Sequence, residues 1–283
     1  MTCPICARAE MVRDGHYAHC AACGYWSSDL EPDVANTAGL DSEYDLVSYE
    51  HTRRANYLRI LDALAPRHGA GSRMLEIGCA DGLFLELAHT HNGYVALGIE
   101  PNTKMMANNR FGQDIRQGFF PDVLAGAERF DVIALNCVFE HVPDLDAMIE
   151  SFKAYLAPGG SVMLNVPVSS GFMFHAARAL FRVGVRYPFD RIWQKGFVSP
   201  HLHYFASENL ATLLARHAFE LVAETPLALF SLGGIYQRLS LDPNIRFVQR
   251  WSALGALYAY YPVQRFAPDA RAFVFAHSSA SSS

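Results

Sequence analysis

The chain has 283 residues, 51% of them hydrophobic, and a formal net charge of −5. This length suits one large α/β domain with attachments, and the apolar content can fill a sizeable core. An acidic balance gives no general attraction to a phosphate backbone, so nucleic acid is disfavoured as a partner. Because neither a signal peptide nor an apolar run of about 18 residues is visible, we expect a cytoplasmic protein without a membrane span.

Two Cys-x-x-Cys pairs occur in residues 1–28, and the segment 11–18 between them has the right length for a short hairpin. The four cysteines are Cys3, Cys6, Cys20 and Cys23. This spacing lets four thiolates converge on one tetrahedral Zn²⁺ and leaves no open position for a substrate, so we predict a zinc ribbon with a structural ion. A disulfide pair is the competing interpretation. His16 and His19 are alternative ligands.

A stretch rich in Asp, Pro, Ala and Ser follows and predicts a linker over residues 29–43. Apolar residues recur at helical spacing after it, which predicts a helix over residues 44–64. We expect the ribbon to form one side of a substrate pocket. Recognition of a macromolecule is the alternative.

Residues 74–82 predict a buried strand followed by a glycine turn. The apolar run Met74–Ile77 suits a parallel strand, and Gly78 and Gly82 permit a tight turn and close approach of a ligand to the backbone. Glu100 ends the next apolar strand, where a carboxylate can accept hydrogen bonds from two ribose hydroxyls. The sequence therefore predicts a nucleoside site. A dinucleotide is disfavoured because G-x-G-x-x-G spacing is missing.

Further strands are predicted in the order of an open α/β fold. They cover residues 115–118, 130–136, 162–166, 220–225 and 272–276, and a Pro-Gly-Gly turn at 158–160 precedes the third of them. Ser207 is expected to cap the helix that leads to Phe219.

Taken together, the glycine turn, Glu100, the Phe130-Asp131 strand and the Pro-Gly-Gly turn resemble the class I S-adenosylmethionine (SAM) methyltransferases. The resemblance implies an α/β fold with a seven-stranded, mostly parallel Rossmann-like sheet over residues 44–277. Aromatic-rich insertions would occupy 169–199 and 227–268, and residues 278–283 would form a disordered tail. One departure is that Ala80 stands where the family has its middle glycine.

The predicted SAM contacts come from the turn, the strand ends and an aromatic pair that would flank the adenine. They are Tyr49, Glu76, Gly78, Cys79, Ala80, Gly82, Glu100, Pro101, Gly118, Phe119, Phe120, Asn136 and Cys137. For Tyr49 and the two phenylalanines, packing in the core is the alternative.

Residues 200–206, Pro-His-Leu-His-Tyr-Phe-Ala, are similar to the Glu-His-Leu-x-Tyr-Phe-Ser motif of deoxysugar C-methyltransferases. A looser form occurs in O-methyltransferases of ubiquinone synthesis. The match makes His201 the first candidate for the general base, although Pro200 replaces the motif's glutamate. His141 after the fourth strand is the second candidate, and His203 and Tyr204 would orient the substrate.

The insertion 169–199 alternates aromatic residues with arginines, which favours a lid over an anionic or amphipathic acceptor. Contact with a membrane surface or a partner is the alternative. The insertion 227–268 would enlarge the pocket or form a dimer contact, so the chain is a monomer or a homodimer.

We therefore expect a SAM-dependent methyltransferase that acts on a small molecule, by O-methylation of a saccharide, nucleotide-sugar or related metabolite. C-methylation of a keto-sugar is the first alternative. Methylation of rRNA or tRNA and a non-catalytic zinc-ribbon interaction protein are the others.

Overall fold

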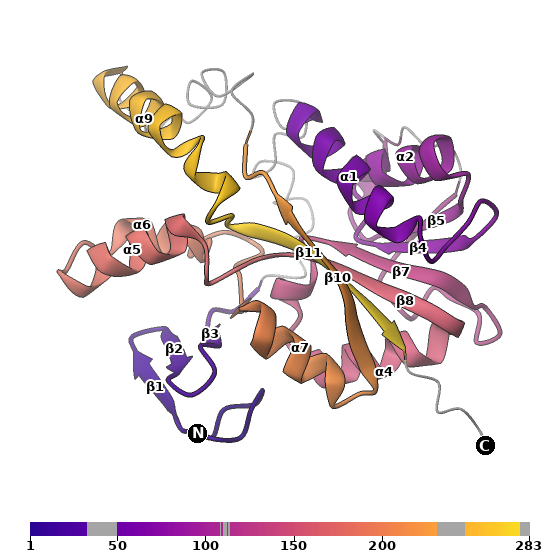
Figure 1. The fold of residues 1–283 in the computed structure, drawn as a ribbon, viewed down its shortest axis with the longest axis horizontal. Coiled ribbons are helices and arrows are strands. Elements are labelled where there is room, and N and C mark those ends of the chain that lie inside the picture. The colour runs from indigo at the N-terminus through magenta and orange to yellow at the C-terminus, as the bar shows by residue number, and fades with distance from the viewer. Residues whose placement is uncertain (33–49, 108, 110–111, 113, 231–246, 278–283) are drawn as a thin grey trace.

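The computed structural model describes residues 1–32, 50–107, 109, 112, 114–230 and 247–277. Its centre is a seven-stranded sheet in the order β10-β11-β8-β7-β4-β5-β6 (Figure 1). The strands are β4 (Arg73–Ile77), β5 (Val95–Glu100), β6 (Ile115–Gln117), β7 (Phe130–Asn136), β8 (Leu156–Pro167), β10 (Phe219–Leu227) and β11 (Ala270–His277). Six of these strands run in the same direction, and β11 alone is antiparallel to them. The predicted mostly parallel sheet is confirmed.

Alternate side chains of the central strands enter two separate cores. Met74 packs with helices α1 (Glu50–Leu64) and α2 (Leu83–Asn92) on one face. Leu75, one residue later, packs on the other face with α4 (Leu145–Tyr155) and α7 (Ser207–Ala215). Because side chains alternate along a strand, apolar runs such as β4 must be covered on both sides. Helix α3 (Thr103–Ala107) follows β5.

The N-terminal segment forms a second, smaller sheet. Strands β1 (Met11–Asp14) and β2 (Tyr17–Cys20) make the hairpin expected between the two cysteine pairs, and β3 (Trp26–Ser28) follows. The fourth strand, β9 (His203–Tyr204), comes from the C-terminal half and pairs with β3. The motif around His201 therefore continues directly into the edge of the ribbon sheet.

Side chains of the following helix fasten the ribbon to the larger sheet. Asn209 Nδ2 donates to the carbonyl of Cys23 at 3.0 Å, and Arg216 donates to the carbonyl of Ile5 at 3.1 Å. Cys3, Ile5 and Tyr25 are buried in the same apolar cluster as α4 and α7. The ribbon thus shares a core with the larger sheet.

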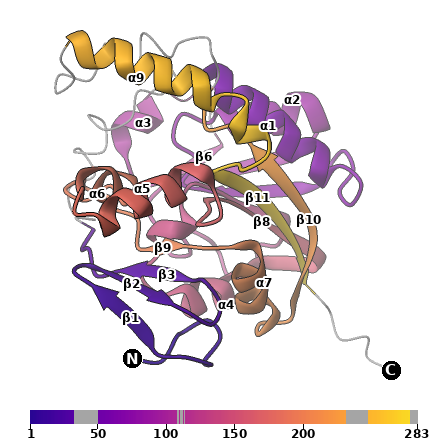
Figure 2. The same ribbon diagram turned by 60° about the vertical axis from the view of Figure 1, so that its left-hand side comes forward.

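The insertion after β8 folds into helices α5 (Phe172–Arg182) and α6 (Tyr187–Ile192), which lie beside the ribbon (Figure 2). Its aromatic side chains pack against Tyr17 and Trp26 of the ribbon. The Tyr17 hydroxyl donates to Asp190 at 2.7 Å, and the guanidinium of Arg178 lies 5.0 Å from the Trp26 ring centroid. Some of the aromatic and basic side chains of this insertion thus pack against the ribbon.

The second insertion ends in helix α9 (Phe247–Tyr260), which extends away from the sheet, and the short helix η3 (Val263–Arg265) (Figure 1). Within the described residues, no helix combines the length and apolarity needed to cross a bilayer. Tyr49, residues 33–43 of the predicted linker and the tail 278–283 lie outside the described residues.

One expectation about a helix start is wrong. Ser207 is the first residue of α7, and Ala206 holds the N-cap position. The Ser207 hydroxyl donates to Glu224 at 2.8 Å, while Asn209 accepts a bond from the Ala206 amide at 3.0 Å. The side chain of Asn209 thus satisfies an amide at this helix start by reaching back from the first turn.

We predict that Trp193→Ala lowers the free energy of unfolding by about 3–5 kcal/mol, because a fully buried indole leaves a cavity. Trp193 is 0% exposed and stacks on Tyr17 with ring centroids 5.1 Å apart. Trp251→Ala is the matched control, since Trp251 is 53% exposed and its loss should change stability within about 0.5 kcal/mol. Urea unfolding measures both. Equal costs would show that Trp193 does not anchor the insertion to the ribbon.

Candidate functional site

The four ribbon cysteines form a compact cluster. Their sulfur atoms all lie within 4.8 Å of one another, and the pairs Cys3–Cys23 and Cys6–Cys20 are each 3.7 Å apart. Four sulfurs at about 2.3 Å around a tetrahedral Zn²⁺ are separated by about 3.8 Å, whereas a disulfide needs about 2.05 Å. The donor set and its spacing therefore fit zinc. Among described residues the cluster includes neither His16, which bonds Asp29, nor His19, which stacks on Trp26.

The glycine turn after β4 is closed by the Glu100 carboxylate. Glu100 Oε2 accepts from the amide of Ala80 at 2.9 Å, and Oε1 accepts from the amide of Asn102 at 2.8 Å. Gly78 has φ +72°, and a Cβ there would lie 2.6 Å from a Val138 methyl. Ala80 has φ +50°, a conformation that favours glycine, which explains why the family pattern has glycine at this place.

Glu76 lies on β4 below the turn and is only 1% exposed. Its Oε1 accepts from Asn136 Nδ2 at 2.9 Å, and Asn136 accepts in turn from Asn165 Nδ2 at 3.1 Å. Glu76 Oε2 is buried and has no hydrogen-bond partner among the described residues. Burial raises the pKa of Glu76 to about 8. A cationic ligand group beside Oε2 would satisfy this atom.

An ion pair that the sequence analysis missed fixes helix α1 over the turn. Arg53 makes two bonds to Asp81, from Nη2 to Oδ1 at 2.6 Å and from Nη1 to Oδ2 at 3.2 Å. Asp81 is 2% exposed, so this bidentate pair is shielded from water. The two residues are 28 positions apart, and no local pattern in the sequence links them.

The structure distributes the other predicted SAM contacts between the turn, the strand ends and the core. Cys79 is buried under the turn with its sulfur against Gly98, and Cys137 is exposed at the end of β7 with φ +55°. Phe120 packs in the core against Tyr155 with ring centroids 5.6 Å apart, whereas Phe119 is 52% exposed. Of the aromatic pair, only Phe119 is available to a ligand at the surface.

Three further predicted contacts line the same edge of the sheet. Gly82 adopts φ +77° at the start of α2, and Pro101 follows Glu100 at the end of β5. Gly118 has φ +136°, and a Cβ there would lie 2.4 Å from Val123. The positive φ angles of Gly82 and Gly118 favour glycine for local geometry, whatever binds beside them.

Glu140, His141 and His201 converge although two different segments supply them. One donor atom from each lies within 4.8 Å of the others, and the two histidine rings meet edge to face at 4.9 Å. Glu140 and His141 sit on the short helix η2 (Phe139–His141) after β7. Glu140 is 1% exposed, and its Oε2 has no hydrogen-bond partner among the described residues. This carboxyl stands near His201 although position 200, where the motif has glutamate, is proline.

Burial controls the charge of this cluster. It raises the pKa of Glu140 to about 8 and lowers the pKa of His141 to about 4. It also lowers the pKa of His201 well below the usual value. A low-dielectric surrounding disfavours the charged form of each of the three groups.

The other two residues predicted to orient substrate make buried bonds to protein groups. His203 Nδ1 accepts from the Tyr25 hydroxyl at 2.5 Å, and Nε2 donates to the carbonyl of Val142 at 2.9 Å. The Tyr204 hydroxyl donates to the carbonyl of Ile192 at 2.9 Å and contacts His201 at 3.1 Å. His203 therefore links the ribbon to the end of η2, and Tyr204 links β9 to α6.

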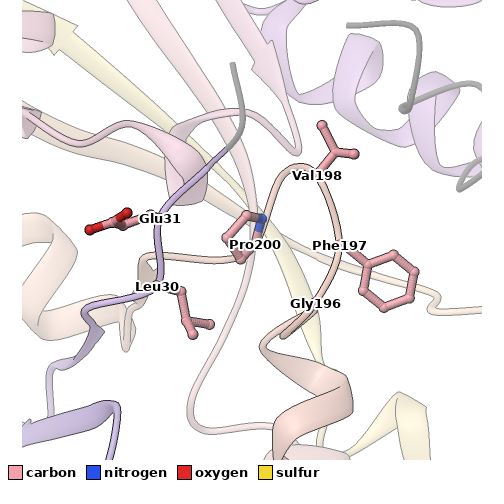
Figure 3. Close-up of a pocket in the computed structure, with 6 residues that line it drawn as sticks. All are labelled: Leu30, Glu31, Gly196, Phe197, Val198 and Pro200. Carbon is pink, nitrogen blue, oxygen red and sulfur yellow. The ribbon is translucent and has the colours of Figure 1, made fainter. Parts of the chain in front are cut away.

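Figure 3 shows a pocket of about 290 Å³ between residues 30–31 and the loop 196–200. It is lined by Leu30, Glu31, Gly196, Phe197, Val198 and Pro200. The Pro200 carbonyl contacts His141 Nδ1 at 2.9 Å, so the pocket wall is continuous with the histidine cluster. The volume suits a ligand of about the size of one sugar or aromatic ring.

Comparison with known proteins assigns the domain that contains the larger sheet to a family. A family model described as a methyltransferase domain matches residues 49–224, more than half of the chain. A chain from the complex between the Haloferax volcanii Trm112 methyltransferase activator and a methyltransferase superposes with a TM-score of 0.58 at 14% identity. That match covers 89% of this chain and 99% of the other.

Two curated relatives match parts of the sequence. The ubiquinone biosynthesis O-methyltransferase of Actinobacillus pleuropneumoniae is 34% identical over 107 residues, which are 34% of this chain and 45% of that protein. The C-methyltransferase NovU of Streptomyces niveus is 28% identical over 204 residues, which are 68% of this chain and 43% of that protein. The chain thus spans less than half of each relative. The chain belongs to the methyltransferase domain family and has the fold of the class I SAM-dependent methyltransferases.

Proposed function

We propose that this protein transfers the methyl group of SAM to a hydroxyl oxygen of a small molecule. The observation that carries the proposal is the pairing of the strained glycine turn with Glu100, whose carboxylate is held by the amides of Ala80 and Asn102. An acid fixed at the end of the second strand can accept both ribose hydroxyls of a nucleoside. The relatives named as methyltransferases and the matching domain support SAM as that nucleoside.

The unpartnered oxygen of Glu76 supports the same cofactor. SAM carries an ammonium group on its methionine part, and a buried acceptor without a partner gains most from a charged donor. Asn136 and Asn165 orient Glu76 so that Oε2 stays free. Phe119 and Gly118 would border the adenine. Tyr49 lies outside the described residues, and its contact with the methionine part of SAM stays a prediction.

SAM supplies a methyl group bound to a positively charged sulfur. When the carbon–sulfur bond breaks, the sulfur keeps the electron pair of that bond. The protein's part is alignment of the acceptor oxygen with the methyl carbon, which can contribute roughly 7–11 kcal/mol. The hydroxyl proton must pass to a base as the new carbon–oxygen bond forms. The Glu140–His141–His201 cluster offers the candidate bases, and a positioned base contributes about 10²–10⁴-fold.

The acceptor that fits best is a small metabolite such as a saccharide or a nucleotide-sugar, with the sugar ring that accepts the methyl group bound between residues 30–31 and 196–200. The pocket is of one-ring size and lies beside the histidine cluster. C-methylation of a keto-sugar is the second candidate, because the relative named as a C-methyltransferase matches 68% of this chain. The cluster can also take a proton from an activated carbon, so the same residues serve either reaction.

We also propose that the four cysteines bind one structural Zn²⁺. The ion would fix the ribbon, through which Tyr25 and β3 hold the segment 201–205 in place. With the ribbon at residues 1–28 and the methyltransferase domain at 44–277, the metal would support the acceptor side of the site and take no part in methyl transfer.

Replacing Glu100 tests the ribose assignment. Glu100→Ala should weaken SAM binding by at least about 100-fold, because two hydrogen bonds to a charged acceptor are lost and each is worth about 1.5–3 kcal/mol. Isothermal titration calorimetry measures the affinity, and Glu100→Gln should fall between the two proteins. Glu220→Ala, at an exposed position of β10, is the control and should bind like the wild type. Unchanged affinity in Glu100→Ala would contradict the assignment.

Metal analysis tests the ribbon. Purified protein should contain a single zinc per chain, and a strong chelator should lower the melting temperature and increase the exposure of Tyr25 and Trp26 to quenchers. Cys20→Ser should lose the metal, whereas Cys137→Ser should keep it. A metal-free protein with an unchanged melting temperature would show that the cluster is not a structural metal site.

A metabolite screen with methyl-labelled SAM tests the reaction. Label should enter a low-molecular-mass product from a cell extract, and it should sit on oxygen by mass spectrometry and NMR. Label on carbon would favour the C-methyltransferase alternative. Label recovered only in RNA, or in no product while SAM still binds, would refute the proposed acceptor class.

A further inference from the structure

The hydrogen-bond partners of His201 determine which ring nitrogen carries its proton. The Tyr204 hydroxyl has one proton, and a carbonyl only accepts, so this proton goes to Ile192 O at 2.9 Å. The contact of 3.1 Å between Tyr204 and His201 Nδ1 must then have the ring as donor. His201 is therefore protonated on Nδ1.

The remaining nitrogen of His201 is not free. Gln194 Nε2 lies 3.0 Å from His201 Nε2, and an amide NH₂ can only donate. Gln194 has φ +54°, a conformation that L side chains rarely adopt, and it is held there where its amide reaches the ring. The His201 amide also donates to the carbonyl of Trp193 at 3.0 Å. Residues 192–194 thus engage this histidine on three sides.

His141 differs in one respect. Its Nδ1 lies 2.9 Å from the carbonyl of Pro200, which requires a proton on Nδ1, with the Ser199 oxygen beside it at 3.1 Å. Its Nε2 has no hydrogen-bond partner among the described residues, and Glu140 Oε1 lies 3.9 Å away. The side chain keeps 13% exposure, so the lone pair of Nε2 can meet a ligand.

We propose that His141 is the general base of this site and that His201 is a positioning residue. Gln194, His201 and Tyr204 pin the loop 192–200, so that the Pro200 carbonyl holds the Nδ1 proton of His141 and leaves Nε2 available. Pro200 occupies the place of the motif's glutamate, and its main chain does the orienting. The acceptor hydroxyl gives its proton to His141 Nε2 as its oxygen takes the methyl carbon. The base role rests on the proposed function, whereas the ring tautomers do not.

Nitrogen-15 NMR of histidine-labelled full-length protein tests the tautomers without any acceptor. His141 and His201 should both show a protonated Nδ1, although free histidine prefers the Nε2 form. His203 is the internal control, because its bonds to Tyr25 and Val142 require the opposite tautomer. Gln194→Leu should shift the Nε2 resonance of His201 and leave that of His141 unchanged. A proton on Nε2 of His141 in the ligand-free protein would overturn the proposal.

Kinetics with the acceptor from the labelled-SAM screen tests the base. His141→Gln should lower kcat about 10²–10⁴-fold with SAM affinity unchanged, and should remove the fall of kcat at low pH that protonation of His141 causes. His201→Gln should raise KM more than it lowers kcat. If His201→Gln instead abolishes turnover while His141→Gln retains it, the assignment is wrong. If the wild type methylates nothing, the proposed function fails, and the ring spectra still decide the tautomers.

Discussion

The backbone of residues 201–205 is the connection on which the arrangement of the molecule depends. Leu202 donates to the carbonyl of Glu140 and accepts from the amide of Ser28, at 2.8 and 2.9 Å. The Phe205 carbonyl accepts from Ser169 at 2.7 Å. One short extended segment thus joins the ribbon, the end of β7 and the end of β8. Buried backbone groups must be paired. Moving this segment would therefore leave hydrogen-bond donors and acceptors unpaired in the ribbon and after both β7 and β8.

A second constraint is electrostatic. The candidate site contains buried carboxyls at Glu76 and Glu140 and buried histidines at His141 and His201, and burial is the largest cause of the pKa shift of each. Burial therefore raises the pKa of both acids to about 8 and lowers the pKa of both histidines, which disfavours the charged form of each group. The unpaired carboxyl oxygens of such a site can bind a ligand. Without a ligand, they lower the free energy of unfolding. Arg53 is a nearby cation, and Asp81 already neutralises it.

The ribbon and the first insertion support each other. Trp26 of β3 lies between His19, Arg178 and the aromatic rings of α5 and α6. Side chains of both units, among them Tyr17, Trp26 and Phe189, form one buried cluster, so each unit completes the core of the other. The alternation of aromatics and arginines in residues 169–199, read from the sequence as a sign of ligand or surface binding, is explained in part by this internal packing.

Local chemistry in the sequence was sufficient for the sheet, the glycine turn, the acid at position 100 and the cysteine cluster. Glycine turns, strand-ending acids and Cys-x-x-Cys pairs act within a few residues of their place in the chain, so their geometry follows from spacing. The sequence could not show that Glu140 stands beside His201, that His203 bonds Tyr25, or that Gln194 caps a ring nitrogen. These pairs come from segments that are far apart or on separate elements, and only folding brings them within hydrogen-bond distance. Tertiary structure alone therefore decided which histidine keeps a free lone pair.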